Sequence, residues 1–188
     1  MIYQPRRKVP CRGCFGHHRA ACSGHQPANA VNPLPVIPPK EFAARRRTLM
    51  QHMGGGIAIV PTNPHHRRNR DTEFPFRPDS DFQYLTGFAE PEAVAVLIPG
   101  RPQGEYVLFC RERDPAKETW TGRRAGLEGA KAIFGADDAF PITDLDDIMP
   151  GLLENRGKVF YSLGAHGEFD QRVLGWVNSL RGKVRAGI

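Results

Sequence analysis

The sequence predicts an α/β fold in which a mixed β-sheet is flanked by helices. From residue 41 onward, segments with helical spacing of apolar residues alternate with short apolar runs. Two of those runs, residues 93–98 and 106–111, are separated by a turn rich in Pro and Gly, which indicates a β-hairpin. The later segments then follow in the order helix, strand, helix, strand, helix, as expected for connections across the faces of a sheet.

The first predicted helix begins at Pro39, since Pro is favoured in the first turn of a helix. Phe42, Leu49, Met50 and Met53 fall on one face of this helix, and we expect the basic triplet 45–47 to point largely to solvent. The run 54–56 is Gly-Gly-Gly and ends the helix, because Gly adopts the left-handed cap conformation without strain.

The remaining elements follow from short apolar runs and helical periodicity. The predicted strands are residues 57–60, 82–85, 93–98, 106–111, 140–142 and 159–163. The predicted helices are residues 127–134, a segment N-capped by Thr143 and kinked or shortened by Pro150, and a final helix over 169–180. The charged stretch 111–126 is predicted to be a loop, and Cys110 is predicted to be a core thiol.

The basic charge of the chain is concentrated in its first part. Residues 1–70 contain 12 Lys and Arg against one acid, whereas residues 71–188 contain 14 against 19. Residues 1–39 contain seven Pro and no acid, a composition typical of a disordered tail. A basic arm can bind nucleic acid, but we favour a solvated tail and expect neither a nucleic-acid nor a membrane partner. Cysteine usage does not indicate a disulfide framework, so we expect a cytoplasmic protein.

The tail also contains a weak metal-binding pattern formed by Cys11, Cys14, Cys22 and His25. Thiolates and imidazoles are ligands that zinc prefers, and Cys-x2-Cys is a common half-site. The spacing between the two halves fits neither a zinc ribbon nor a zinc knuckle, so zinc stays an alternative. A transit peptide and upstream sequence translated from an early start are two further interpretations of this tail.

Catalytic motifs of the common kinds are absent from the sequence. There is no nucleophile elbow, phosphate-binding loop, paired-histidine zinc motif or dinucleotide fingerprint. The pairs Asp79 with Asp81 and Glu90 with Glu92 are spaced to share a strand face and hold a metal ion. We favour a structural role for these acids, as acceptors for nearby backbone amides and Arg77. Trp120 lies in a polar stretch; it could stack on a flat ligand such as a prolyl ring, but from composition alone we favour the interpretation that it anchors its own loop.

Three blocks of the sequence carry a family resemblance. The longest, 77–93, reads RPDSDFQYLTGFAEPEA, and the blocks WTGRRAG (120–126) and EFAARR (41–46) accompany it in order. Residues 40–185 resemble the N-terminal domain of aminopeptidase P, the Xaa-Pro aminopeptidases, whose fold is creatinase-like. The resemblance implies a mixed α/β layer that mediates homo-oligomer contacts and walls the substrate cleft.

The resemblance also implies a separate catalytic pita-bread domain that holds two manganese ions and cleaves the bond before proline in a peptide. We therefore expect this chain to hold no cofactor and to have no peptidase activity alone. The alternative is a stand-alone binding or interaction module that has lost its peptidase partner. By motif position, Trp120 would stack on the substrate, Asp71 would lie near the ammonium end of the peptide, and Arg185 would reach the active-site region. The expected organisation is a tail over 1–39, a domain over 40–180, and the start of a truncated linker over 181–188.

Overall fold

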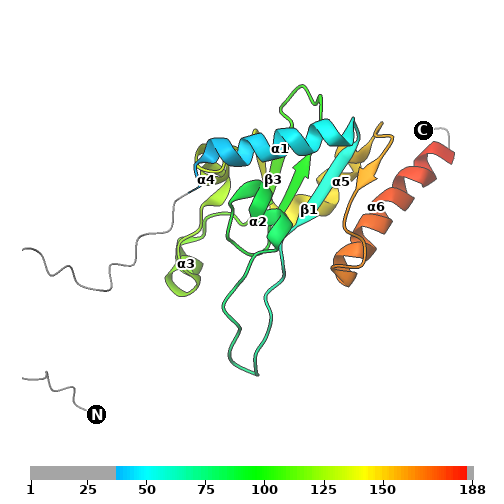
Figure 1. Cartoon of the computed structure of the whole chain (residues 1–188). Helices are drawn as coiled ribbons and strands as arrows, with labels where there is room; N and C mark the ends of the chain where they lie inside the picture. The colour runs from blue at the N-terminus through cyan, green and yellow to red at the C-terminus, as the bar shows by residue number, and fades with distance from the viewer. Residues whose placement is uncertain (1–36, 186–188) are drawn as a thin grey trace, which may run out of the picture. The chain divides into compact units, whose positions relative to one another are not determined.

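The computed structural model describes residues 37–185, which form a five-stranded sheet with helices on both faces (Figure 1). The strands are β1 (Ile57–Pro61), β2 (Val94–Leu97), β3 (Tyr106–Cys110), β4 (Asp138–Pro141) and β5 (Val159–Phe160). The helices are α1 (Pro39–Met53), α2 (Ser80–Thr86), α3 (Pro115–Thr121), α4 (Gly126–Ala132), α5 (Leu145–Leu153) and α6 (Gly167–Arg185), with a 3₁₀ turn η1 (Ile142–Asp144) before α5. The predicted α/β fold is confirmed.

The sheet is mixed, with the strand order β4-β3-β2-β1-β5. Strands β1, β2 and β3 pair antiparallel, and Val96 lies opposite Val107 in the predicted hairpin. The outer strands pair parallel to their neighbours, β4 to β3 and β5 to β1. Parallel strands must be joined by a crossover connection. The helices between β3 and β4, and the helix between β4 and β5, form these connections.

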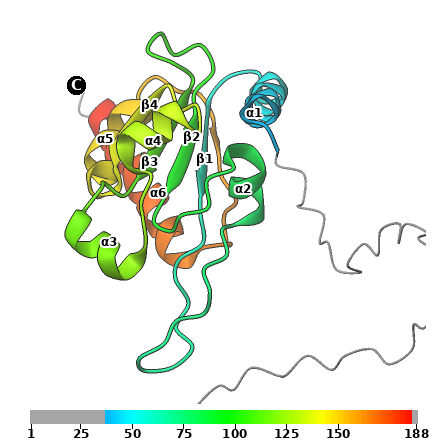
Figure 2. The ribbon, with the colours of Figure 1, turned by 90° about the vertical axis from the view of Figure 1, so that its left-hand side faces the viewer.

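Two hydrophobic clusters lie on opposite faces of the sheet, because neighbouring strand residues point to opposite sides. In β1, Ala58 belongs to the cluster that α1, α2 and α4 complete. Ile57 and Ile59 belong to the other cluster, which α5 and α6 complete. Figure 2 shows the sheet between α1 and α2 on one side and α5 on the other. Both faces are thus covered by helices, as a layered α/β architecture requires.

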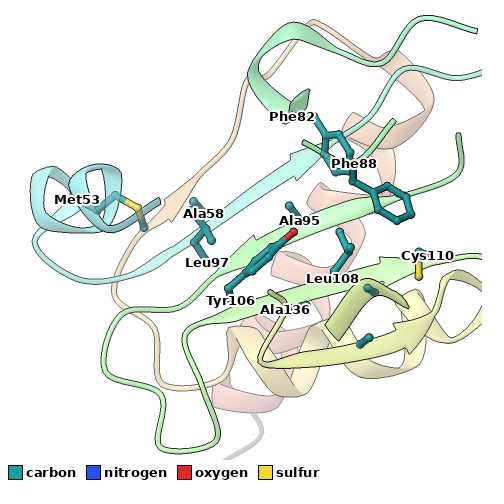
Figure 3. Packing of buried hydrophobic residues seen from close by; sticks show 13 residues of the cluster. Met53, Ala58, Phe82, Phe88, Ala95, Leu97, Tyr106, Leu108, Cys110 and Ala136 are labelled. Carbon is teal, nitrogen blue, oxygen red and sulfur yellow. The ribbon is translucent and has the colours of Figure 1, made fainter. Parts of the chain in front are cut away.

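The first cluster combines small strand residues with aromatic rings (Figure 3). Phe82 of α2 and Phe88 are fully buried, and their rings pack edge to face with centroids 6.3 Å apart. Phe88 makes a second edge-to-face contact with Phe134, at 4.8 Å. Aromatic pairs in this geometry stabilise a core beyond the area that they bury. The aromatic-rich stretch 74–92 therefore belongs partly to the core.

The prediction of a strand over residues 82–85 is wrong, because these residues belong to the helix α2. Asp79 caps this helix: its side chain accepts hydrogen bonds from the backbone amides of Asp81 and Phe82, at 2.9 and 3.0 Å. Gly87 ends it in the left-handed conformation, with φ of 68°. Phe82 and Leu85 are buried three positions apart, which is a helical spacing.

Five other expectations differ from the structure. The stretch 111–126 contains the helix α3, and the Thr143 hydroxyl donates to Asp144 Oδ1 instead of capping α5. Helix α5 includes Pro150 and ends at Leu153. Strand β5 is two residues long instead of spanning 159–163, and α6 spans Gly167–Arg185, longer at both ends than the predicted helix over 169–180.

Arg46 is buried, contrary to the expectation that the basic triplet of α1 faces solvent. Its guanidinium donates a hydrogen bond of 2.9 Å to the carbonyl oxygen of Leu85 in α2. Burial lowers the pKa of Arg46, partly offset by the neighbouring Tyr106 and Asp137. Arg47 is exposed as predicted. Arg46 thus ties α1 to α2 across the first cluster.

Candidate functional site

Helix α3 projects from the body of the domain and buries none of its residues. Asp114 caps its start by accepting a hydrogen bond from the amide of Lys117 at 3.2 Å, and Pro115 occupies the first position. Arg113 donates two hydrogen bonds to Glu118, which raises the pKa of Arg113 and lowers that of Glu118. Capping and ion pairing therefore form this helix, without a buried apolar face.

Trp120 is the side chain that distinguishes this projection. It is 88 % exposed, whereas Trp176 of α6 is 5 % exposed and belongs to the second hydrophobic cluster. An indole ring in water forgoes a large hydrophobic stabilisation, so its exposure favours a role in contact with a ligand or another protein surface. The alternative that Trp120 anchors its own loop does not agree with this exposure.

Asp71 lies in a second projection, the excursion over residues 62–79 between β1 and α2. A bridge between Arg67 and Glu73 closes the base of its tip, and the amides of Arg68 and Asn69 both donate to the carbonyl oxygen of Thr72. Asp71 is exposed, and its carboxylate has no ion-pair or hydrogen-bond partner among the side chains described for residues 37–183. An unpaired surface carboxylate of this kind is free to receive a cationic group.

Arg185 is the last residue of α6. Figure 1 shows this end of α6 on the opposite side of the sheet from α3, with the 62–79 excursion on the lower side. The structure therefore does not bring the three sequence-predicted contact residues together within this domain. Any site that uses all three needs a further protein surface to complete it.

Two open grooves flank the short edge strand β5. One, of about 890 Å³, lies between α1, α2 and β5, and the other, of about 930 Å³, lies between β5 and the C-terminal part of α6. Trp120 and Asp71 line neither groove. The candidate contact residues thus stand on projections from the surface.

Two of the candidate metal ligands in the described part of the chain, Asp79 and Glu90, have structural roles. Among residues 37–185, no group of three or more His, Cys, Asp or Glu side chains is placed to hold a metal ion. Asp79 caps α2, and Glu90 accepts a 2.7 Å hydrogen bond from the Ala125 amide. Arg111, and not the expected Arg77, is the arginine beside Glu90. The contacts of Asp79 and Glu90 agree with the structural interpretation of these two acids.

The cysteines divide into two groups. Cys11, Cys14 and Cys22, with His25, lie outside the described residues, so the zinc alternative stays a hypothesis. Cys110 is fully buried in β3, as predicted, and burial raises the pKa of its thiol to about 12. No helix within residues 37–185 has the length and apolar character needed to cross a membrane.

Comparison with a protein-family model identifies the family of this chain. Residues 42–161 match the model of the aminopeptidase P N-terminal domain. The chain belongs to this family. Its match to the solved structure of aminopeptidase PepP from Pseudomonas aeruginosa has 60 % identity and a TM-score of 0.78, over 80 % of this chain and 34 % of that one.

Curated relatives support the same assignment. The Xaa-Pro aminopeptidase of Escherichia coli is 38 % identical over 150 residues, which cover 79 % of this chain and 33 % of that protein. The mitochondrial intermediate cleaving peptidase 55 of Arabidopsis thaliana is 32 % identical over 167 residues, covering 84 % and 33 %. The chain thus spans about a third of the length of the curated relatives that it matches.

Two features of the aminopeptidase P domain in the structure were not predicted from the sequence. The helix α3 has a local signal that could have been used, since Asp114 followed by Pro115 is a common helix start. The pairing of Glu90 with Ala125 spans 35 residues and has no local signal.

Proposed function

We propose that this chain acts as the non-catalytic N-terminal domain of a Xaa-Pro aminopeptidase, where it makes homo-oligomer contacts and shapes the substrate cleft. Family membership and the names of its relatives support the parent activity. The observation that carries the role of this domain is the 88 % exposure of Trp120 on a helix with no buried residue. A projecting aromatic side chain suits contact with a proline-containing peptide across a subunit boundary.

The side chains of this domain would act by contacting the substrate peptide. We propose that a separate catalytic domain holds the two metal ions of the parent enzyme; among residues 37–183, no group of three or more His, Cys, Asp or Glu side chains is placed to hold a metal ion. Trp120 would stack on the substrate, Asp71 would pair with the ammonium end of the peptide, and Arg185 would act from the end of α6. Because these positions lie apart in one domain, we propose that the cleft is completed by the catalytic domain and a second subunit. We place the enzyme in the cytoplasm, in keeping with the buried free thiol of Cys110.

A chimera tests this proposal. Residues 37–185 would replace the matching segment of the Pseudomonas aeruginosa aminopeptidase, to which they are 60 % identical. We expect the chimera to cleave an Xaa-Pro peptide with manganese, and Trp120→Ala to lower its kcat/KM by about tenfold or more, the loss of a stacking contact. Ile133→Ala, which truncates another exposed apolar side chain, serves as the matched control.

Three outcomes would contradict this proposal. Equal kcat/KM values for the chimera and its Trp120→Ala variant would remove Trp120 from the cleft. Turnover of the same peptide by the 188-residue chain alone would contradict its non-catalytic role. An active chimera that sediments as a monomer would contradict the proposed oligomer contacts.

A further inference from the structure

The carboxylate of Glu90 joins both ends of the segment that carries α3. Its Oε1 accepts a hydrogen bond of 2.7 Å from the backbone amide of Ala125, the residue that precedes α4. Its Oε2 lies 3.6 Å from a guanidinium nitrogen of Arg111, the residue that follows β3. The Glu90 side chain therefore contacts the segment at Arg111, where it leaves β3, and at Ala125, where it joins α4.

The segment between these two contacts has little other attachment to the domain. No residue from 111 to 125 is fully buried, only Ala125 at its end packs against a hydrophobic cluster, and the ion pairs of α3 connect residues within the segment. Near its base, Arg124 donates a 3.3 Å hydrogen bond to the carbonyl oxygen of Glu112, which links the outgoing and returning chains to each other. The direction in which α3 projects thus depends on the contacts at its base.

The base is also the shielded part of the projection. The side chains of Glu90 and Arg111 are 21 % and 13 % exposed, compared with 88 % for Trp120. Glu90 Oε2, Arg111 Nε and Arg124 Nε are buried and make no hydrogen bond within residues 37–185. Removing one member of a shielded charge pair leaves the other without compensation, so the arrangement depends on the carboxylate.

We propose that Glu90 is a positioning residue that fixes α3, and with it Trp120, by bridging Ala125 and Arg111. The consequence for substrate rests on the proposed function, whereas the consequence for the order of Trp120 does not. Since neither end of the segment is held by packing of α3 itself, loss of the bridge releases the projection while both hydrophobic clusters stay intact.

Amide hydrogen exchange and Trp fluorescence on the 188-residue chain test the bridge directly. In Glu90→Ala we expect exchange at Ala125 to accelerate by about tenfold, as for loss of one hydrogen bond to a charged acceptor. Fluorescence anisotropy decay of Trp120, measured in a Trp176→Phe background, should show increased local motion. Glu90→Gln keeps an oxygen for the Ala125 amide but loses the charge facing Arg111, so it should restore part of the protection.

Glu92→Ala is the matched control, since Glu92 is an exposed acid two residues away. It should match the parent in both measurements. Parent-like exchange at Ala125 and parent-like Trp120 motion in Glu90→Ala would overturn the proposal. If Glu90→Ala does not fold, Arg111→Gln and Glu90→Gln decide in its place: increased motion of Trp120 in both supports the bridge, and none in either overturns it.

The chimera separates the positioning role from the proposed function. If Glu90 acts through Trp120, Glu90→Ala should lower kcat/KM when Trp120 is present and cause no further loss in the Trp120→Ala variant. Additive losses would contradict the positioning role and leave the role of Trp120 intact. Loss of Trp120 order in the chain, with no effect of Trp120→Ala on turnover, would support the bridge and refute the proposed cleft contact.

Discussion

The guanidinium of Arg46 lies over the ring of Tyr106, 4.0 Å from its centroid, in the layer between α1 and β3. Both side chains are buried, and burial raises the pKa of Tyr106 well above its usual range despite the neighbouring cation. The same guanidinium donates to the Leu85 carbonyl oxygen. A cation–π contact and a hydrogen bond together compensate a charge that would otherwise be costly in this position.

Arg46→Ala should therefore lower the free energy of unfolding by about 2–4 kcal/mol, because it leaves the Leu85 carbonyl unpaired and a gap over Tyr106. Urea denaturation measures this difference. Arg47→Ala, at the exposed neighbouring position, should change stability by less than about 0.5 kcal/mol. Equal losses for the two variants would contradict the burial of Arg46.

Asp79→Ala should destabilise the domain by about 1 kcal/mol, because the carboxylate accepts two backbone hydrogen bonds at the start of α2. Asp79→Asn, which keeps an acceptor oxygen, should recover most of this loss. Thermal unfolding followed by circular dichroism compares the two variants. If Asn and Ala prove equally destabilising, capping is not the role of Asp79.

The two tryptophans should differ sharply in their effect on stability. Trp176→Ala removes a buried ring that packs edge to face on Phe169, and it should cost about 3–5 kcal/mol. Trp120→Ala should cost less than about 0.5 kcal/mol, since the ring is exposed. Denaturant unfolding measures both values. A large loss for Trp120→Ala would mean that its ring packs against the domain.

Asp146 gives the domain a pH-dependent contact. Hydrogen bonds from Arg172, and then from the Trp176 indole, hold the pKa of its carboxyl below the usual range. A depressed folded-state pKa stabilises the protein above the unfolded-state value near about pH 4, and this contribution is lost as the pH falls through the folded-state pKa.

Asp146→Asn should therefore reduce stability by roughly 1 kcal/mol near neutral pH, a modest value because the carboxylate is largely exposed and screened by solvent. The difference from the parent should shrink as the medium is acidified below about pH 4. Urea unfolding at several pH values provides the test, with Asp147→Asn as the neighbouring exposed control. A difference that does not depend on pH would argue against the ion pair.

The Cys110 thiol should resist alkylation in the folded protein. The thiolate is the reactive form, and burial both raises the pKa of Cys110 and excludes the reagent. In a variant with Cys11, Cys14 and Cys22 changed to Ser, we expect iodoacetamide to modify Cys110 only after denaturation, as measured by mass spectrometry. Modification under native conditions at the rate of a free cysteine would contradict its burial.

Strong local patterns allowed much of the fold to be predicted from the sequence. The Gly-rich stop after α1, the hairpin of β2 and β3, and the apolar spacing of α6 all depend on residues close together in the chain. The predictions of secondary structure were wrong where the local sequence signals were weaker. Residues 82–85 have strand-forming aromatic side chains, but the cap at Asp79 and the burial of Phe82 with Leu85 make them helical.

The sequence by itself determined the family, the mixed sheet and the identity of Trp120 as a candidate contact. Those conclusions depend on the order of residues within short blocks, which a sequence displays directly. Only the tertiary structure decided that Trp120 is exposed, that Arg46 is buried, and that Glu90 bridges Ala125 and Arg111. The physical reason is that burial and pairing depend on which distant segments the sheet brings together.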